Sequence, residues 1–207
     1  EVELSTGQKT GFYLDQRENR RRTAALAAGL DQPRVLNAFS YSGGFGVYIA
    51  RANPAARILN LDDSAAALRL ARRNFELNHC GQCAEYSEGN AFELLRRFRD
   101  EARVYDLIVL DPPNFAGSRN RVPGACRGYK DINLLAMKLL RPGGILATFS
   151  CSSMVGNDLF RKVVFGAAAD AGRSVQVLAS PGHPPDHPWL LNFPEGEYLK
   201  GLFLRVL

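Results

Sequence analysis

VLNAFSYSGGFG, at residues 35–46, is the stretch that decides the fold of this 207-residue chain. It begins as an apolar run, typical of a buried strand, and passes directly into a turn rich in glycine and serine. Gly43, Gly44 and Gly46 would let the backbone approach a ligand closely and begin a helix. Strand, glycine-rich turn and helix together predict a nucleotide-type binding site. The spacing is not that of the G-x-G-x-x-G fingerprint, which argues against a nicotinamide-dependent enzyme.

Strands and helices alternate on both sides of this stretch, which predicts an α/β fold with a parallel sheet covered by helices on both faces. No helix separates the last two strands, so we expect them to pair as an antiparallel hairpin. We expect residues 116–128 to form a long polar loop. Residues 1–14 should be extended, with a helix capped by Asp15 after them. The expected strands are 35–39, 57–61, 84–87, 105–110, 145–150, 174–178 and 199–206, and the expected helices are 16–28, 43–52, 64–77, 90–99, 129–140 and 156–171.

The composition is that of an ordinary globular protein, with 46% hydrophobic and 23% charged residues. No apolar run reaches the length of a membrane span, so we expect no membrane partner. The net charge of +5 modestly favours a polyanionic partner. The chain begins at Glu1 without a methionine or a visible signal peptide, so we expect a piece of a longer protein that acts in the cytoplasm.

Cys80 and Cys83 form a C-x-x-C pair, but no second pair exists at the spacing that a zinc site needs. A redox motif would sit at the start of a helix, whereas this pair follows one. We therefore predict no metal site, and we interpret these cysteines as ordinary thiols of a reducing compartment.

Polar groups follow four consecutive predicted strands: Asp62, Asn90 and Asp111 after the second, third and fourth, and the glycine-rich turn after the first. Carboxyl ends of parallel strands share one edge of a sheet, where ligands bind. Asp62 could accept both ribose hydroxyls of an adenosine, and Asn90 could face an adenine edge as donor and acceptor. Asp63 is the neighbouring candidate, although strand alternation points one of the pair away.

Asp111-Pro112-Pro113 resembles the Asp/Asn-Pro-Pro loop of methyltransferases that act on nitrogen or carbon of planar bases. Cys151 follows the fifth strand and would lie beside this loop if the two strands are neighbours. Carbon-5 of a pyrimidine is a poor nucleophile until a thiolate adds to carbon-6, so a thiol here suits methylation of carbon-5. Asp111 could stabilise charge on the base. Equally, Cys151 could be a small residue at a strand end without a chemical role.

Taken together, the motifs of this chain resemble those of the bacterial 23S rRNA 5-methylcytosine methyltransferases of the RlmI type. The resemblance runs from about residue 7 to the C-terminus. Its motifs are GFYLDQR at 11–17, NAFSYSGGF at 37–45, DPP at 111–113, CRGYKDIN at 126–133, TFSCS at 148–152, DHP at 186–188 and PEGEYLKG at 194–201.

This resemblance implies a Rossmann-like class I methyltransferase domain, with a mostly parallel seven-stranded sheet and an antiparallel C-terminal hairpin. We expect residues 1–30 to be an N-terminal segment and helix that contribute to the cofactor site, and residues 31–207 to be the methyltransferase domain. The family also has an RNA-binding PUA domain before this region. The expected cofactor is S-adenosylmethionine and the expected partner is ribosomal RNA; a homodimer stays open.

The same resemblance implies Cys151 as the nucleophile and Asp111 at the target base. Two positions depart from the family: Asn114 stands where a lysine is frequent, and Asn90 where an aspartate is common. Expected cofactor contacts are Gln16, Arg17, Asn37, Phe39, Ser40, Tyr41, Ser42, Gly43, Asp62, Asp63, Asn90, Asp111 and Pro112. Expected substrate contacts are Pro113, Asn114, Phe115, Arg119, Arg127, Tyr129 and Lys130, the last four from a basic segment that could instead be a solvated loop.

Three functions remain open from the sequence. The first is a cytosine-5 rRNA methyltransferase. The second is a methyltransferase that acts on a base nitrogen or a small molecule, with Cys151 not taking part. The third is a non-catalytic module that binds RNA or the cofactor.

Overall fold

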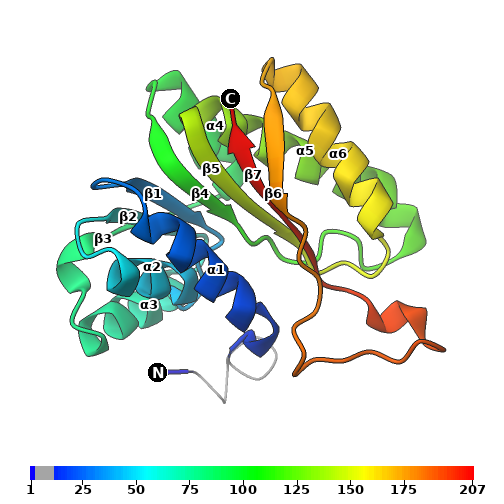
Figure 1. The fold of residues 1–207 in the computed structure, drawn as a ribbon, viewed down its shortest axis with the longest axis horizontal. Coiled ribbons are helices and arrows are strands. Elements are labelled where there is room, and N and C mark those ends of the chain that lie inside the picture. Colours follow the sequence, from blue (N-terminus) through cyan, green and yellow to red (C-terminus); the bar gives the residue numbers. More distant parts are fainter. Residues whose placement is uncertain (3–11) are drawn as a thin grey trace. The chain divides into compact units, whose positions relative to one another are not determined.

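The computed structural model describes residues 1–2 and 12–207, which form two compact units, Glu1–Ala91 and Phe92–Leu207 (Figure 1). Most of the segment that we predicted to be extended therefore lies outside the described residues. The described residues contain seven strands and six α-helices. The predicted α/β class is confirmed: the strands are mostly parallel, and the last two in the chain pair antiparallel.

The first unit is built on three parallel strands in the order β3-β2-β1. Helix α1 packs on α2, and α3 borders β2 and β3; Figure 1 shows α1 and α2 side by side in the blue part of the ribbon. Ser64 caps α3 as predicted, because its Oγ accepts a hydrogen bond from the Ala67 amide at 3.2 Å. The elements are η1 (Leu14–Gln16), α1 (Arg17–Ala28), β1 (Arg34–Ala38), α2 (Gly44–Ala52), β2 (Arg57–Asp62), α3 (Ala65–Leu77), η2 (Gly81–Cys83) and β3 (Ala84–Glu88).

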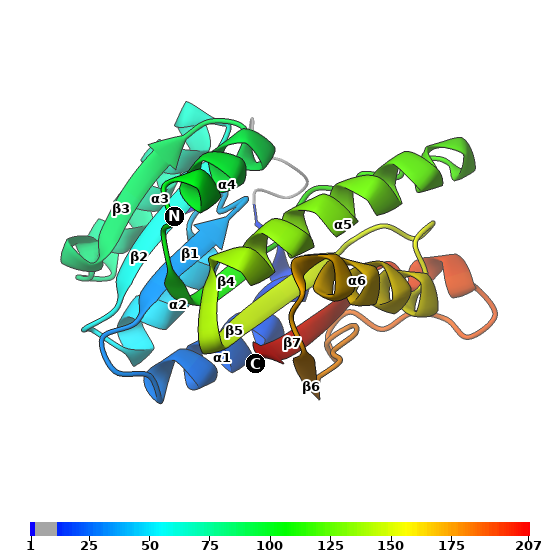
Figure 2. The ribbon, with the colours of Figure 1, turned by 90° about the horizontal axis from the view of Figure 1, so that it is seen from above.

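The second unit has the strand order β4-β5-β7-β6, with β4 parallel to β5 and with β7 antiparallel to both of its neighbours. Helices α5 and α6 pack against each other and lie on the same side of these strands in Figure 2. The elements are α4 (Ala91–Asp100), β4 (Tyr105–Leu110), η3 (Arg119–Arg121), α5 (Val122–Leu139), β5 (Leu140–Ser150), α6 (Asn157–Ala171), β6 (Val175–Ala179), η4 (Pro194–Gly196) and β7 (Lys200–Val206).

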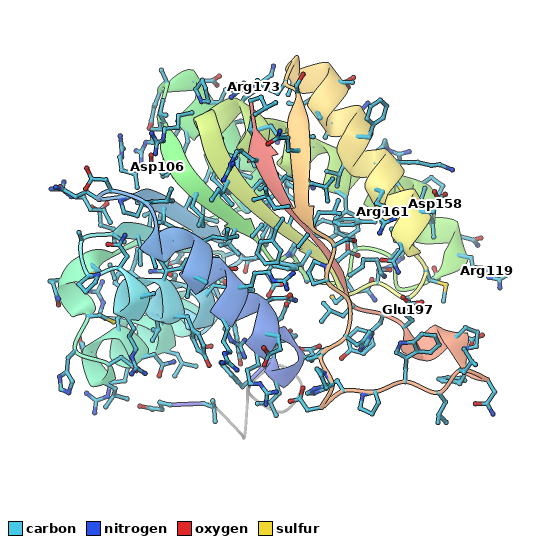
Figure 3. All side chains as sticks on the ribbon, viewed as in Figure 1. Asp106, Arg119, Asp158, Arg161, Arg173 and Glu197 are labelled. Atoms are coloured by element: carbon cyan, nitrogen blue, oxygen red, sulfur yellow. The ribbon has the colours of Figure 1, made fainter. Side chains whose placement is uncertain are left out.

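Arg173 links the C-terminal end of α5 to the C-terminus of the chain. Its guanidinium donates hydrogen bonds to the carbonyls of Met137 and Leu140, where α5 ends, and to the carbonyl of Leu207 (labelled in Figure 3). Arginine thereby satisfies carbonyls that a helix end leaves without intrahelical partners.

Three sequence predictions are wrong in detail. Asp15 does not cap α1, because it lies inside the short η1 turn and α1 begins at Arg17. The predicted loop at 116–128 is largely helix, since α5 already begins at Val122. Strand β5 begins at Leu140 rather than at 145, with a register irregularity where it pairs with β4.

The early start of α5 has a local physical cause. Pro123 stands in the first turn, where a missing backbone N–H costs nothing. Ala125, Tyr129 and Ile132 are buried at helical spacing and supply the apolar face. The glycines and polar residues between them obscured that periodicity in the sequence.

Gly46 provides a stability test in the first unit. A Cβ at this position would meet Asn60 Oδ1 and Phe75 Cζ, both at 2.8 Å, inside the core. We expect Gly46→Ala to lower the free energy of unfolding by about 1–3 kcal/mol, as overpacking does. The measurement is urea denaturation followed by circular dichroism.

Gly124→Ala is the control for this test. Its new Cβ would meet only the Arg127 guanidinium, at an ordinary 3.8 Å, and alanine favours a helix over glycine. This variant should be as stable as the parent or slightly more so. Equal stability of Gly46→Ala and the parent would contradict the packing described here.

Candidate active site

The turn after β1 has an unusual backbone. Phe39, Tyr41 and Gly43 all have positive φ angles, of 58°, 45° and 75°. Such angles are costly for the two aromatic residues and persist only where surrounding structure fixes them. Two hydrogen bonds do so: the Ser40 amide donates to the Leu61 carbonyl at 2.9 Å, and the Gly43 amide donates to the Ser40 carbonyl at 2.8 Å. The turn is therefore held in one conformation by the end of β2.

Asp62 stands beside this turn at the end of β2. Its carboxylate accepts hydrogen bonds from the Tyr41 amide at 2.8 Å and the Ser64 amide at 3.1 Å, one at each oxygen. Burial raises the pKa of Asp62, against the lowering effect of these two bonds. Asp63 is exposed, as strand alternation predicted for one of the pair. Each Asp62 oxygen keeps a further acceptor position for a ligand hydroxyl.

Ser40 offers a second polar group at this turn. The side chain is buried, and among the residues that the structure describes no hydrogen-bond partner reaches its Oγ. A buried hydroxyl without a partner indicates a place where a ligand completes the hydrogen bonding. Gly43 leaves no room for a side chain, since a Cβ there would lie 3.0 Å from that of Ala71, so this glycine lets the turn pack on α3. The unpartnered Ser40 hydroxyl and the acceptor positions of Asp62 fit a polar ligand at this turn.

The other predicted cofactor residues of this unit differ in exposure. Asn37 is buried, and its amide donates to Asn60 Oδ1 at 2.9 Å, which joins β1 to β2. Gln16 is also buried and accepts a hydrogen bond from Asn19 at 2.6 Å. Arg17 is exposed and pairs with Glu18. Asn90, which follows β3, is also exposed, whereas Ser42 is buried in the turn.

The second unit holds the predicted reactive groups on two adjacent strands. Asp111 and Pro112 follow β4, and Cys151 follows β5, its parallel neighbour. The Cys151 Sγ lies 3.9 Å from the Pro112 carbonyl oxygen, to which the thiol donates. Cys151 and Asp111 are both partly exposed. The predicted placement of the thiol beside the Asp-Pro-Pro loop is therefore confirmed.

Tyr129 has a different position from the one that we predicted. It lies inside α5 with no exposed surface, and its hydroxyl accepts a hydrogen bond from Ser150 Oγ at 3.0 Å. Its ring packs on Phe115, with 4.8 Å between the centroids. Burial raises its pKa to about 12, so the phenol stays protonated. A side chain without exposed surface does not touch RNA, and the predicted RNA contact is corrected to a supporting role under the Asp-Pro-Pro loop.

The remaining predicted substrate residues lie on the outside of the second unit. Pro113 and Asn114 are exposed, as are Arg119 and Arg127. Arg119 projects outward just before α5 in Figure 3. Lys130 is partly buried and forms an ion pair with Asp170 at 2.7 Å. The Asp170 carboxylate therefore partly neutralises the positive charge of Lys130.

Sequence reasoning missed Lys200, which is 1% exposed at the beginning of β7. Its ammonium donates a hydrogen bond to the Ser152 carbonyl, next to Cys151. The available signal was a lysine directly before a run of apolar strand residues, a position where burial of a charge requires a reason.

Among the described residues, no group of three His, Cys, Asp or Glu side chains could hold a metal ion. No helix among them has the length and apolar character needed to cross a bilayer. Cys80 and Cys83 are buried, and burial raises the pKa of both thiols, which disfavours the reactive thiolate.

Curated relatives match this chain over nearly all of its length. The protein named Ribosomal RNA large subunit methyltransferase I of Shewanella frigidimarina is 52% identical over 206 residues, which are 99% of this chain and 51% of that protein. The protein of the same name from Erwinia tasmaniensis is 49% identical over 207 residues, 100% of this chain and 51% of its own length. The chain thus spans about half the length of the curated relatives that it matches.

Solved structures support the fold. SMU.776, assigned as a methyltransferase and crystallised with SAH, superposes with a TM-score of 0.86 at 24% identity, over 99% of this chain and 53% of its own. At this identity the likeness establishes the fold alone.

A family comparison covers almost the whole chain. Residues 1–197 match the family described as S-adenosylmethionine-dependent methyltransferase. The chain belongs to the S-adenosylmethionine-dependent methyltransferase family.

Proposed function

We propose that this chain is the methyltransferase part of an enzyme that forms 5-methylcytosine in 23S rRNA through a covalent adduct on Cys151. The observation that carries the proposal is the partly exposed Cys151 thiol, 3.9 Å from the Pro112 carbonyl of the Asp-Pro-Pro loop. The names of the relatives, which are large-subunit rRNA methyltransferases, support ribosomal RNA as the substrate. A ribosomal substrate would place the protein in the cytoplasm.

Cys151 is the proposed nucleophile of the reaction. The Cys151 thiolate adds to carbon-6 of cytosine, and the electron pair of the 5,6 double bond becomes available at carbon-5. The cofactor supplies an electrophilic methyl group, which forms a bond to carbon-5 as S-adenosylhomocysteine departs. A base then removes the carbon-5 proton, the double bond re-forms and the thiolate leaves. Asp111 is proposed to hold the base edge and to stabilise charge that develops on it.

The proposed cofactor contacts in the first unit divide by function. Asp62 would accept the ribose hydroxyls, and Asn90 would face the adenine. The strained turn would lie against the rest of the cofactor, as helix-opening turns of this kind do. The further proposed contacts are Gln16, Arg17, Asn37, Phe39, Ser40, Tyr41, Ser42, Gly43 and Asp63, together with Asp111 and Pro112 of the second unit.

RNA contacts are proposed for the exposed residues that follow the Asp-Pro-Pro loop. Arg119 and Arg127 would neutralise phosphates, and Lys130 less so because of its ion pair with Asp170. Pro113 and Asn114 are exposed next to the catalytic acid, where a flat base would lie, and Phe115 is half-buried there. Asn114 offers hydrogen bonds but no positive charge.

Asp62→Asn tests the cofactor assignment. Hydrogen bonds to a charged group are worth about 1.5–3 kcal/mol, so we expect S-adenosylmethionine to bind about tenfold more weakly or worse, by calorimetry. Asp31→Asn, at an exposed aspartate of the first unit outside the proposed cofactor contacts, should bind normally. Because burial raises the pKa of Asp62, affinity of the parent should begin to fall on acidification at a higher pH than an exposed carboxylate would give. Unchanged affinity in Asp62→Asn would exclude this carboxylate from the site.

Cys151→Ala tests the covalent step. We expect methyl transfer to rRNA to fall by about 10³-fold or more, with cofactor binding intact. RNA with 5-fluorocytidine should trap the parent as a stable, cofactor-dependent adduct at Cys151, because fluorine blocks proton removal from carbon-5.

Cys126→Ala is the matched control, since Cys126 is also a half-buried free thiol of the second unit. It should retain both transfer and trapping. Full activity of Cys151→Ala would contradict the covalent proposal and favour methylation of a base nitrogen or a small molecule. Absence of S-adenosylmethionine binding in the parent would favour a non-catalytic module.

Arg119→Gln tests the RNA surface. We expect weaker RNA binding in a fluorescence titration and a slope of log affinity against log salt reduced by about one. Lys138→Gln, at the exposed far end of α5, should leave the slope unchanged. An identical slope for Arg119→Gln and the parent would remove Arg119 from the interface.

A further inference from the structure

Lys200 is a buried lysine at the beginning of β7, in register with Ser150 of β5 across an antiparallel pair. Its Nζ lies 2.5 Å from the Ser152 carbonyl oxygen, to which it donates. Ser152 in turn donates from its Oγ to the Ala116 carbonyl at 3.3 Å. The lysine therefore ends inside the turn that presents Cys151, on the strand that flanks β5 opposite β4.

Ionisable groups of several elements surround this lysine and the thiol. Cys151 and Glu197 both interact electrostatically with Lys200 and favour its charged form. Glu197, which precedes β7 and is labelled in Figure 3, is held by a hydrogen bond from Asn157 Nδ2 at 2.8 Å. Tyr129 of α5 interacts electrostatically with Cys151 and with Asp111, which follows β4. Lys200 is the cationic member of this group.

We propose that Lys200 is a positioning residue that stabilises Cys151 as the thiolate and so sets the pH range in which the nucleophile is available. The inference rests on the proposed role of Cys151. Nearby cations are the usual means by which proteins make a thiol reactive, because the thiolate and not the thiol is the nucleophile. A buried ammonium is screened weakly by solvent, so its charge acts strongly on a neighbour.

A cation fits this position better than a proton acceptor. Burial lowers the pKa of Lys200 to about 8. At pH 7 the ammonium then exceeds the free amine by about ten to one. The charged thiolate raises the lysine pKa in return, so each charge favours the other. The hydrogen bond to Ser152 also fixes the ammonium relative to the turn.

The test compares Lys200→Gln and Lys200→Met with the parent. Glutamine keeps a donor for the Ser152 carbonyl without the charge, and methionine fills the apolar space. Iodoacetamide alkylation of Cys151 is followed across pH by mass spectrometry of its peptide. We expect the midpoint of the pH profile to rise by about one unit or more in both variants. The acid limb of methyl transfer should move with it.

Two controls distinguish a shift of the Cys151 midpoint from a general loss of packing. Cys126 is alkylated in the same samples and should keep its midpoint, and Lys162→Met, an exposed lysine paired with Asp158, should leave Cys151 unchanged. An unchanged Cys151 midpoint in a folded Lys200 variant would overturn the proposal, and so would an equal shift at Cys126. A Cys151 shift without any 5-fluorocytidine adduct in the parent would support this inference and reject the covalent function.

A reciprocal experiment needs no change at Lys200. Coupling between two titrating groups acts equally in both directions. The Lys200 side-chain carbon signal, titrated by NMR with labelled lysine, should therefore show a lower midpoint in Cys151→Ser than in the parent. An identical midpoint in the two proteins would overturn the proposal even if both Lys200 variants fail to fold.

Discussion

The parallel pairing of β4 with β5 is the constraint on which the proposed chemistry depends. Leu110 and Thr148 are partners in this register, so the two strands end at the same edge. Asp111 and Pro112 therefore emerge beside the turn that holds Cys151, and the Pro112 carbonyl accepts from the thiol. A slip of one residue would turn every side chain of β5 to the other face and remove the thiol from the loop. The antiparallel β7 fixes the other side of β5 and brings Lys200 to the same turn.

A comparable constraint operates in the first unit. The positive φ angles of Phe39 and Tyr41 are tolerable because the Leu61 carbonyl and the Asp62 carboxylate hold the turn. Asp62 supports the backbone of the turn, and we propose that its remaining acceptor positions face the cofactor. Strain of this kind is found where a backbone is preorganised for binding. The first unit supplies the groups proposed for the methyl donor, and the second supplies those proposed for the nucleophile and the acceptor base.

Most of this arrangement could be predicted from the sequence, because strand ends follow from apolar runs that stop at polar or turn residues. Each of the seven expected strands overlaps an observed strand, although β5 begins earlier than expected, and Asp62, Asp111 and Cys151 stand at strand ends as expected. Local periodicity failed at the start of α5, where glycines and a first-turn proline resemble a loop. Tyr129 was for that reason assigned to a surface that it does not reach. Lys200 could not be assigned, since its nearness to Cys151 depends on pairing between β5 and β7, far apart in the chain.

The measurement that tests the central claim most directly is nucleoside mass spectrometry after transfer of a labelled methyl group from S-adenosylmethionine to 23S rRNA that lacks the modification. The account predicts that the label appears in 5-methylcytidine. Label in N4-methylcytidine or in a methylated purine would contradict it, because neither product requires a thiol at the end of β5. Label in 5-methyluridine would contradict cytosine as the target base.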